Sequence, residues 1–307
     1  MGIGYWVLSM DGILVVNKPQ GGTSHDVVGR IRRLTHQKRV GHAGTLDPMA
    51  TGVLLVCLGR ATRVAEYLME SDKTYRAVVR LGVETDTYDA EGQVVATHPV
   101  NVDESDLRAA LVHFVGAIDQ VPPMYSALKR KGKPLYQLAR QGIEVEREPR
   151  RVTIYDISLR AWQPPDVTIY VRCSSGTYIR SLAHDIGAML ECGAHLAALT
   201  RLASGSFRLE DAATFQDLEG LHASRLRGLL HPLDTALQDL PILTLDADRA
   251  RRMVLGQAIP IVGVEASAGS SLCRAHDVSG ALLAIVTFDA AAQVWRPKKV
   301  LADAGPA

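Results

Sequence analysis

One carboxylate in a glycine-rich segment is the residue whose type and setting most suggest chemistry. Asp47 lies in the sequence GTLDP at residues 44–48, inside a stretch from 36 to 51 whose Gly41, Gly44 and Pro48 predict a loop. A carboxylate can act as a nucleophile, and a covalent intermediate divides one difficult step into two easier ones. The same residues are typical of an ordinary turn, so Asp47 alone does not decide between a catalytic and a structural role.

Hydrophobic spacing predicts the elements that position this loop. Residues 12–17 predict a buried strand, and a helix capped by Thr23 or Ser24 follows, with apolar residues at helical spacing up to Leu34. An apolar strand is expected at 53–58 and a helix near 61–69. A strand at 73–81 could pair with 93–97. Later elements are predicted as a helix at 103–114, a short helix at 135–141, strands at 151–161 and 167–173, and a helix at about 178–190.

Because these strands and helices mix without strict alternation, an α+β fold is preferred over a doubly wound sheet. After Pro241 the pattern changes to short strands with Gly and Ser turns, at 258–262, 271–276, 281–288 and 294–297. The length of 307 residues allows one large domain and one small one. We therefore expect domains at 1–240 and 241–307.

Composition excludes several classes of protein. The hydrophobic share of 47% indicates a globular chain, and apolar runs such as 52–58 are too short to cross a bilayer. The first ten residues lack the layout of a signal peptide. The four cysteines are far apart and form no pair at metal-ligand spacing. We expect a cytoplasmic protein with reduced thiols, no membrane association and no bound metal.

Charge is distributed unevenly in a chain whose formal net charge is only +1. Residues 27–46 contain five basic residues and no acid. Residues 120–151 contain eight basic and three acidic residues, so each zone has a local charge of +5. Basic zones are typical of nucleic-acid binding, but solvated surfaces have the same pattern, so charge alone leaves both interpretations open.

Four sequence blocks carry a resemblance to a known family. They are VNKPQGGTS at 16–24, GHAGTLDPMATG at 41–52, DKTYR at 72–76 and SGTYIRS at 175–181. In this order and spacing the chain resembles the bacterial tRNA pseudouridine-55 synthases, the TruB family. Matches at 82–92, at VPPMYSALK in 121–129 and at 195–207 extend the likeness over most of residues 12–208. The segment after Pro241 is similar to the family's RNA-binding PUA module in length and strand content.

The resemblance implies a fold and an activity. The fold would be that of a pseudouridine synthase, with a mixed, largely antiparallel central sheet flanked by helices and a small β-rich, PUA-like domain at the C-terminus. Residues 1–240 would be catalytic, with a basic RNA clamp at about 120–151. The activity would be isomerisation of uridine 55 in the T-arm of tRNA to pseudouridine, by a monomer without a cofactor or an obligate protein partner.

The resemblance also implies residue roles. Asp47 would be the nucleophile, and Arg180 would keep its pKa low and steady charge during the reaction. Tyr75 would stack on the uracil and assist removal of the C5 proton, although a tyrosine on such a strand is more commonly buried core. Whether Asp47 attacks C1′, attacks C6 or acts at C2′ stays open.

Further residues would bind the RNA. A base in a folded loop must leave its stack to react, at a cost of about a few kcal/mol. Tyr178 and Leu199 would contact the flipped nucleotide, His42 would pack near the space that the base leaves, and Lys18 would support the wall of the site. Without the resemblance Tyr178 and Leu199 would be assigned to the core, His42 would be structural, and Lys18 would be a solvated lysine at the end of a strand. Possible phosphate contacts are Arg30, Arg33, Lys129, Arg130 and Lys131.

Two other functional classes remain in competition at this point. A non-catalytic RNA-binding or tRNA-folding protein would tolerate Asp47→Asn. A nucleoside or sugar hydrolase with an aspartate nucleophile would release the free base, and a glycosidase usually needs a second carboxylate that the sequence does not place beside Asp47. A pseudouridine synthase of another family, with another RNA substrate, is a related alternative.

Overall fold

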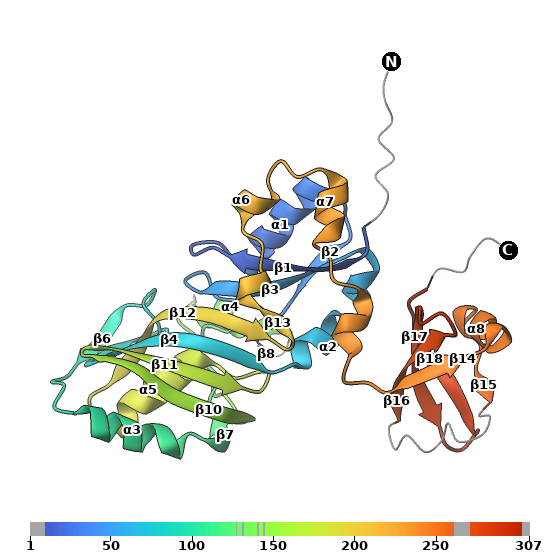
Figure 1. The fold of residues 1–307 in the computed structure, drawn as a ribbon. Coiled ribbons are helices and arrows are strands. Elements are labelled where there is room, and N and C mark those ends of the chain that lie inside the picture. Colours follow the sequence, from blue (N-terminus) through green and yellow to red (C-terminus); the bar gives the residue numbers. More distant parts are fainter. Residues whose placement is uncertain are drawn as a thin grey trace.

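The computed structural model of this chain describes residues 10–126, 128–130, 132–139, 141–143, 145–260 and 271–302 (Figure 1). The first 208 residues contain a sheet of nine strands. These strands are β1 (Gly12–Lys18), β2 (Val40–Ala43), β3 (Thr51–Leu58), β4 (Lys73–Leu81), β7 (Gly116–Gln120), β10 (Arg150–Gln163), β11 (Asp166–Cys173), β12 (Ala194–Ser204) and β13 (Phe207–Arg208). They run in the order β1-β3-β12-β4-β11-β10-β7, with β2 on β3 and β13 on β12.

All neighbouring strands of this sheet are antiparallel except β3 and β12, which are parallel and pair only at Thr51 with Thr200 and Gly52 with Arg201. Gly52 is required at this contact because its φ is +101° and a β carbon there would lie 2.2 Å from the Arg201 carbonyl oxygen. The sheet is therefore mixed and largely antiparallel, as predicted. Two short hairpins lie outside it, β5 (Val83–Thr85) with β6 (Val94–Thr97), and β8 (Lys129–Arg130) with β9 (Lys133–Pro134).

Helices flank the strands, and the last of them, at 247–254, packs on the C-terminal strands instead of the larger sheet (Figure 1). They are α1 (Ser24–Thr35), α2 (Ala65–Glu70), α3 (Glu104–His113), α4 (Leu135–Ala139), α5 (Ile179–Met189), α6 (Phe215–Leu218), α7 (Ala223–Gly228) and α8 (Ala247–Val254), with 3-10 helices η1 (Gly59–Arg63), η2 (Leu209–Asp211) and η3 (Leu233–Leu237). Thr23 caps α1 in a capping box with Asp26. Apolar side chains of α1, α3 and α5 pack on the strands in one cluster that includes Ile31, Val79 and Ile186.

The C-terminal part forms a second, five-stranded sheet in the order β14-β16-β17-β18-β15. Its strands are β14 (Ile242–Leu245), β15 (Ile259–Pro260), β16 (Leu272–Asp277), β17 (Leu282–Asp289) and β18 (Val294–Val300). Ile285 and Leu301 pack in one cluster with Ile13 and Leu55 of the larger sheet, so the two sheets share buried apolar surface. The predicted α+β fold with a β-rich C-terminal domain is confirmed.

Some expected elements differ from the structure. Strand β12, at the centre of the larger sheet, was not predicted, and β2 lies inside the predicted loop. The expected pairing of 93–97 with 73–81 was wrong: Gly82 turns the chain with a φ of +83°, so β6 pairs with β5 instead. The helix expected near 61–69 is divided into η1 and α2. Residues 261 and 262 of the strand expected at 258–262 lie outside the described residues.

No helix in the described part of the chain is long and apolar enough to cross a membrane. All four cysteines are buried and free.

Candidate active site

Asp47 lies in the short connection between β2 and β3. Gly44 begins this connection with a φ of +88°, a left-handed conformation that glycine adopts without strain. The Ala50 amide donates to the Asp47 carbonyl at 3.1 Å and closes a turn around the aspartate. The neighbouring Leu46 amide donates to the Ser24 hydroxyl at 2.9 Å, and that hydroxyl donates back to the Leu46 carbonyl at 3.1 Å. Ser24 therefore ties the loop to α1, while Thr23 caps the helix.

Arg201 of β12 supports the same loop from inside the protein. Its guanidinium donates to the carbonyls of Gly44 at 2.9 Å, Thr45 at 3.3 Å and Val53 at 2.6 Å. The residue is 1% exposed and forms no ion pair among the described residues. Its positive charge is therefore satisfied by backbone carbonyls, which orient the loop.

Lys18 supports the other end of the loop. Its ammonium donates to the carbonyls of Ala50 at 2.7 Å, Pro19 at 2.9 Å and Pro48 at 3.2 Å. Burial lowers the pKa of Lys18, and the charge of Asp47 opposes that shift. The predicted position of Lys18 in the wall of the site fits these contacts, although its functional role stays a prediction.

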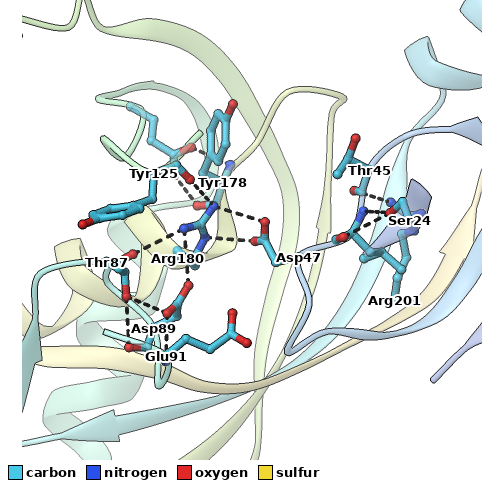
Figure 2. A network of polar contacts seen from close by, with 12 residues as sticks. Ser24, Thr45, Asp47, Thr87, Asp89, Glu91, Tyr125, Tyr178, Arg180 and Arg201 are labelled. Carbon is cyan, nitrogen blue, oxygen red and sulfur yellow. Dashed lines mark hydrogen bonds and ion pairs between the residues drawn. The ribbon is translucent and has the colours of Figure 1, made fainter. Parts of the chain in front are cut away.

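Arg180, at the start of α5, joins two carboxylates from distant parts of the chain (Figure 2). Its Nη2 donates to Asp47 Oδ1 at 3.3 Å, and its Nε lies 3.0 Å from Asp47 Oδ2 at an angle too poor for a hydrogen bond. Its Nη1 lies 3.3 Å from Asp89 Oδ2. The side chain of Arg180 is 6% exposed and that of Asp89 is 4% exposed, whereas that of Asp47 is 35% exposed. Asp47 is therefore the member of this group that solvent or a substrate can reach.

The remaining contacts of Arg180 fix its direction. Nη2 also donates to the Tyr125 carbonyl at 2.9 Å, and Nη1 lies 3.5 Å from the Thr87 carbonyl (Figure 2). Gln120 holds the start of α5, because its side chain accepts from the Tyr178 amide at 2.8 Å and donates to the Tyr178 carbonyl at 3.0 Å. Arg180 thus projects from a well-fixed helix end.

The electrostatics of Asp47 differ from the expectation. Burial raises the pKa of the Asp47 carboxyl, and the charge of Asp89 raises it further, while Arg180 and Lys18 lower it. The prediction that Arg180 keeps the pKa of Asp47 low was wrong, because the loss of solvation raises this pKa by more than the ion pair lowers it. Arg180 still provides the largest opposing effect, so it is the main group that favours ionised Asp47.

The predicted pocket residues come from three strands and the start of α5. Tyr75 of β4 is 8% exposed, and burial raises the pKa of its phenol, an effect that the positive charge of Arg201 opposes. Leu199 of β12 is 8% exposed and belongs to the same apolar cluster as Tyr75. Tyr178 is half-buried, and burial raises the pKa of its phenol.

His42 is half-buried on β2, five residues before Asp47. Burial lowers the pKa of its imidazole, and the charge of Arg201 lowers it further. The ring is therefore neutral at neutral pH. Its Nδ1 is buried without a hydrogen-bond partner among the described residues. A neutral ring in this position can stack on a base.

The predicted phosphate contacts are not gathered at Asp47. Arg33 is exposed on α1, and Arg30 of the same helix lies over the Phe215 ring and pairs with Glu219. Lys129 and Arg130 lie in strand β8, and Lys131 lies outside the described residues. No group of three or more His, Cys, Asp or Glu side chains that could hold a metal occurs among the residues that the structure describes.

Sequence reasoning missed Asp89 and Arg201. Asp89 lies in the segment 82–92 that contributes to the resemblance, so that segment carried a usable signal. Its side chain is positioned by the Thr87 hydroxyl at 2.6 Å and the Glu91 amide at 3.0 Å (Figure 2). Arg201 lies in 195–207, which also contributes to the resemblance, but the strand that carries it was not predicted, so its side chain was not expected to face the loop of Asp47.

Two family profiles match this chain. The TruB family pseudouridylate synthase N-terminal domain matches residues 32–179, and the tRNA pseudouridylate synthase B C-terminal domain matches residues 180–238. The chain is 52% identical to tRNA pseudouridine synthase B of Syntrophotalea carbinolica over 82% of each chain. It is 47% identical to the protein of the same name from Chromohalobacter salexigens, over 95% of this chain and 94% of that one.

Solved structures with a similar fold include a chain in the crystal structure of a Cbf5-Nop10-Gar1 complex. It superposes with a TM-score of 0.73 at 27% identity and covers 96% of this chain and 86% of that chain. A chain of the archaeal box H/ACA sRNP Nop10-Cbf5 complex gives a TM-score of 0.72 at 26% identity, over 96% and 88% of the two chains.

Proposed function

Because this chain belongs to the TruB family of pseudouridylate synthases, we propose that it converts uridine 55 in the T-loop of tRNA to pseudouridine. The similar proteins named tRNA pseudouridine synthase B supply tRNA as the class of substrate. The observation within the molecule that supports the proposal best is the partly exposed Asp47 carboxylate held by the buried Arg180.

The reaction is an isomerisation and needs no oxidant or donor of a chemical group. The bond between N1 and C1′ breaks, a bond between C5 and C1′ forms, C5 loses a proton and N1 gains one. A protein therefore has to supply a nucleophile, hold the detached base and move a proton. We propose that the side chains around Asp47 do this without a cofactor.

Asp47 is the proposed nucleophile. Its carboxylate is the exposed partner in the group with Arg180 and Asp89, so it can approach the sugar or the ring of a bound nucleotide. Loss of solvation makes the ionised form more reactive than a carboxylate in water, and Arg180 offsets part of the cost of ionisation. Asp89 holds the opposite side of the guanidinium and so orients it toward Asp47.

The target nucleotide has to leave the folded loop to reach Asp47. We propose that Tyr75 stacks on the uracil while Tyr178 and Leu199 contact the flipped nucleotide. The raised pKa of the Tyr75 phenol means that it stays neutral at neutral pH, which suits stacking and passing a proton better than carrying a negative charge. His42 would stack where the base has left the loop, which its neutral ring allows.

Two other regions would hold the rest of the RNA. The basic segment at about 120–151 is the proposed clamp, with Lys129, Arg130 and Lys131 as phosphate contacts. Residues 1–240 would form the catalytic domain, and residues 241–307 a PUA-like domain that binds RNA. We propose that the protein acts in the cytoplasm as a monomer with no obligate protein partner, which sedimentation with and without tRNA would check.

The deciding experiment is incubation of the purified protein with unmodified tRNA, followed by chemical mapping of pseudouridine. We expect one product, at the T-loop uridine, and none with Asp47→Asn. A folded protein that produces no pseudouridine there contradicts the proposal. Release of free uracil would indicate a hydrolase, and full activity of Asp47→Asn would rule out Asp47 as nucleophile.

A further inference from the structure

One residue beside the candidate active site has a left-handed backbone although it is not glycine. Tyr88 has a φ of +64°. Its neighbours Thr87 and Asp89 both contact Arg180. A bulky side chain is strained in this conformation, and strained residues persist only where the surrounding contacts hold them. The contacts of Tyr88 therefore show which part of the fold depends on its position.

The backbone around Tyr88 is tied to strand β12. The Leu196 amide donates to the Tyr88 carbonyl at 3.0 Å, and the Ala90 amide donates to the Leu196 carbonyl at 3.0 Å. The Asp89 carbonyl accepts from the Thr85 hydroxyl at 2.8 Å. These bonds fix the backbone of this segment on the sheet, but they do not connect it to helix α5.

The Tyr88 side chain makes that connection. Its ring stacks on the imidazole of His184, with 4.1 Å between the ring centroids and 28° between the ring planes. His184 follows Arg180 by four residues in α5, so the two side chains lie on the same face of the helix. The segment of Asp89 and helix α5 therefore meet at two places, the stacked rings and the ion pair of 3.3 Å between Asp89 and Arg180.

The position of residues 87–89 determines the direction of the Arg180 guanidinium. A guanidinium is planar, so the contacts of its Nη1 with Asp89 Oδ2 and the Thr87 carbonyl determine where the edge formed by Nε and Nη2 points. That edge faces the carboxylate of Asp47. A shift of residues 87–89 relative to α5 would turn this edge away from Asp47.

We propose that Tyr88 and His184 are positioning residues whose stacked rings set the direction of Arg180. They hold the segment of Asp89 at a fixed distance from α5, so that the guanidinium faces Asp47. The inference rests on the proposed function and deepens it, because it concerns the same carboxylate of Asp47. A purely structural ring pair would stabilise the protein without changing the chemistry of that carboxylate.

The direct test is the titration of Asp47 in the full-length protein without RNA, followed by the carbon NMR signal of its carboxyl group. The charged groups that act on this carboxyl are those of Arg180, Asp89, Lys18 and Glu91. Among them, Arg180 lowers the pKa of Asp47 the most. Asparagine has no ring and adopts a left-handed backbone more readily than most residues, so Tyr88→Asn removes the stack without adding backbone strain. We expect this variant to raise the pKa of Asp47 further, and an unchanged or lower pKa would overturn the proposal.

Variants of both rings separate the stack from other roles of the two residues. Tyr88→Phe and His184→Phe keep a ring pair, so each should retain the wild-type pKa of Asp47. His184→Ala removes the second ring and should raise that pKa as Tyr88→Asn does. The double variant should raise it no further than either single variant, because both remove the same contact. Additive shifts, or a phenylalanine variant that behaves like Tyr88→Asn, would contradict the proposal.

Glu191→Asn is the matched control for the backbone. Glu191 follows α5 with a φ of +55°, so it has the same left-handed conformation but no ring. The same replacement there should leave both the pKa of Asp47 and kcat unchanged, and a change equal to that of Tyr88→Asn would reject the role of the stack. If Tyr88→Asn does not fold, His184→Ala provides the same comparison from a half-buried position.

Activity is the second readout, and it separates this inference from the proposed function. In a protein that forms pseudouridine in tRNA, Tyr88→Asn should lower kcat about threefold to tenfold, the equivalent of one aromatic pair, and leave KM unchanged. A higher KM with an unchanged kcat would show that the ring binds RNA instead, which would overturn the positioning role. If the wild type forms no pseudouridine, the proposed function fails, whereas the titration of Asp47 still decides whether the ring pair directs Arg180.

Discussion

The loop of Asp47 is held by cations on two sides, and the partners of these cations differ. Arg180 faces the carboxylates of Asp47 and Asp89, whereas Arg201 faces backbone carbonyls, including that of Gly44. A cation beside a carboxylate changes the charge and pKa of a group that can react. Arg201 forms no ion pair with Asp47 and mainly fixes the position of the backbone, although its charge also lowers the pKa of Tyr75 and of His42. We therefore expect the Arg180 side to control chemistry and the Arg201 side to control stability.

The largest expected effect comes from Asp47→Asn, which removes the reacting group from the Arg180 side. Turnover should fall by a factor on the order of 10⁴ or more, while the affinity for tRNA stays close to that of the wild type. Pseudouridine mapping and filter binding measure the two quantities. A parallel loss of activity and binding would contradict the separation of chemistry from RNA recognition.

Stability provides the control for Asp47→Asn. The pKa of Asp47 is higher in the folded state than in the unfolded state. Between these two pKa values the native protein binds more protons than the unfolded chain. Its stability therefore falls as the pH rises through that range. At neutral pH the ionised carboxylate therefore costs stability, and asparagine removes this cost. The urea midpoint of the variant should be no lower than that of the wild type.

The second effect concerns Arg180→Gln. Without the guanidinium, Asp47 and Asp89 face each other unpaired, so the pKa of Asp47 should rise further. We expect kcat to fall by about 10²- to 10³-fold and the acid limb of its pH profile to move to higher pH. Arg180→Lys keeps the positive charge but loses the planar guanidinium, so it should shift the acid limb of the pH profile less than Arg180→Gln does. An unmoved acid limb in Arg180→Gln would show that Arg180 does not tune Asp47.

The third effect is that of Arg201→Met, which tests the contacts of Arg201 with the backbone carbonyls of the loop. Methionine has a similar length but leaves the carbonyls of Gly44, Thr45 and Val53 without their donor. The free energy of unfolding should fall by roughly 3 kcal/mol, as expected for several unsatisfied buried acceptors. Urea unfolding measures this loss. The acid limb of kcat should stay in place, and a shift like that of Arg180→Gln would remove the distinction between the two sides.

The smallest effect is expected for Ser24→Ala, which removes the hydroxyl that holds Leu46. The loss should be about 1 kcal/mol of stability, with a several-fold lower kcat because Asp47 is less well positioned. Thr23→Ala is the matched control: it removes the cap of α1 at a similar cost of about 1 kcal/mol but leaves the loop contact intact. Equal kcat values for the two variants would show that the Ser24 contact does not position the loop.

The sequence predicted those helices and strands that are specified by patterns within their own residues. The spacing of apolar residues in α1 and its capping residue are such signals, as is the alternation of buried residues in β4. Strand β12 was missed because its sequence AHLAALTRLAS is rich in Ala and Leu, which favour helices. Its pairing with β3, β4 and β13 overrides that preference.

The sequence by itself determined the family and the α+β class, and it identified Asp47 and Arg180 as a candidate catalytic pair. These depend on residue types in a fixed order. Only the tertiary structure decided that Asp89 shares Arg180, that Arg201 supports the loop of Asp47, and that burial raises the pKa of Asp47. Asp47 and Arg201 are 154 positions apart, and solvation depends on everything packed around a group. Such properties arise from contacts between distant segments, which no local pattern of residues specifies.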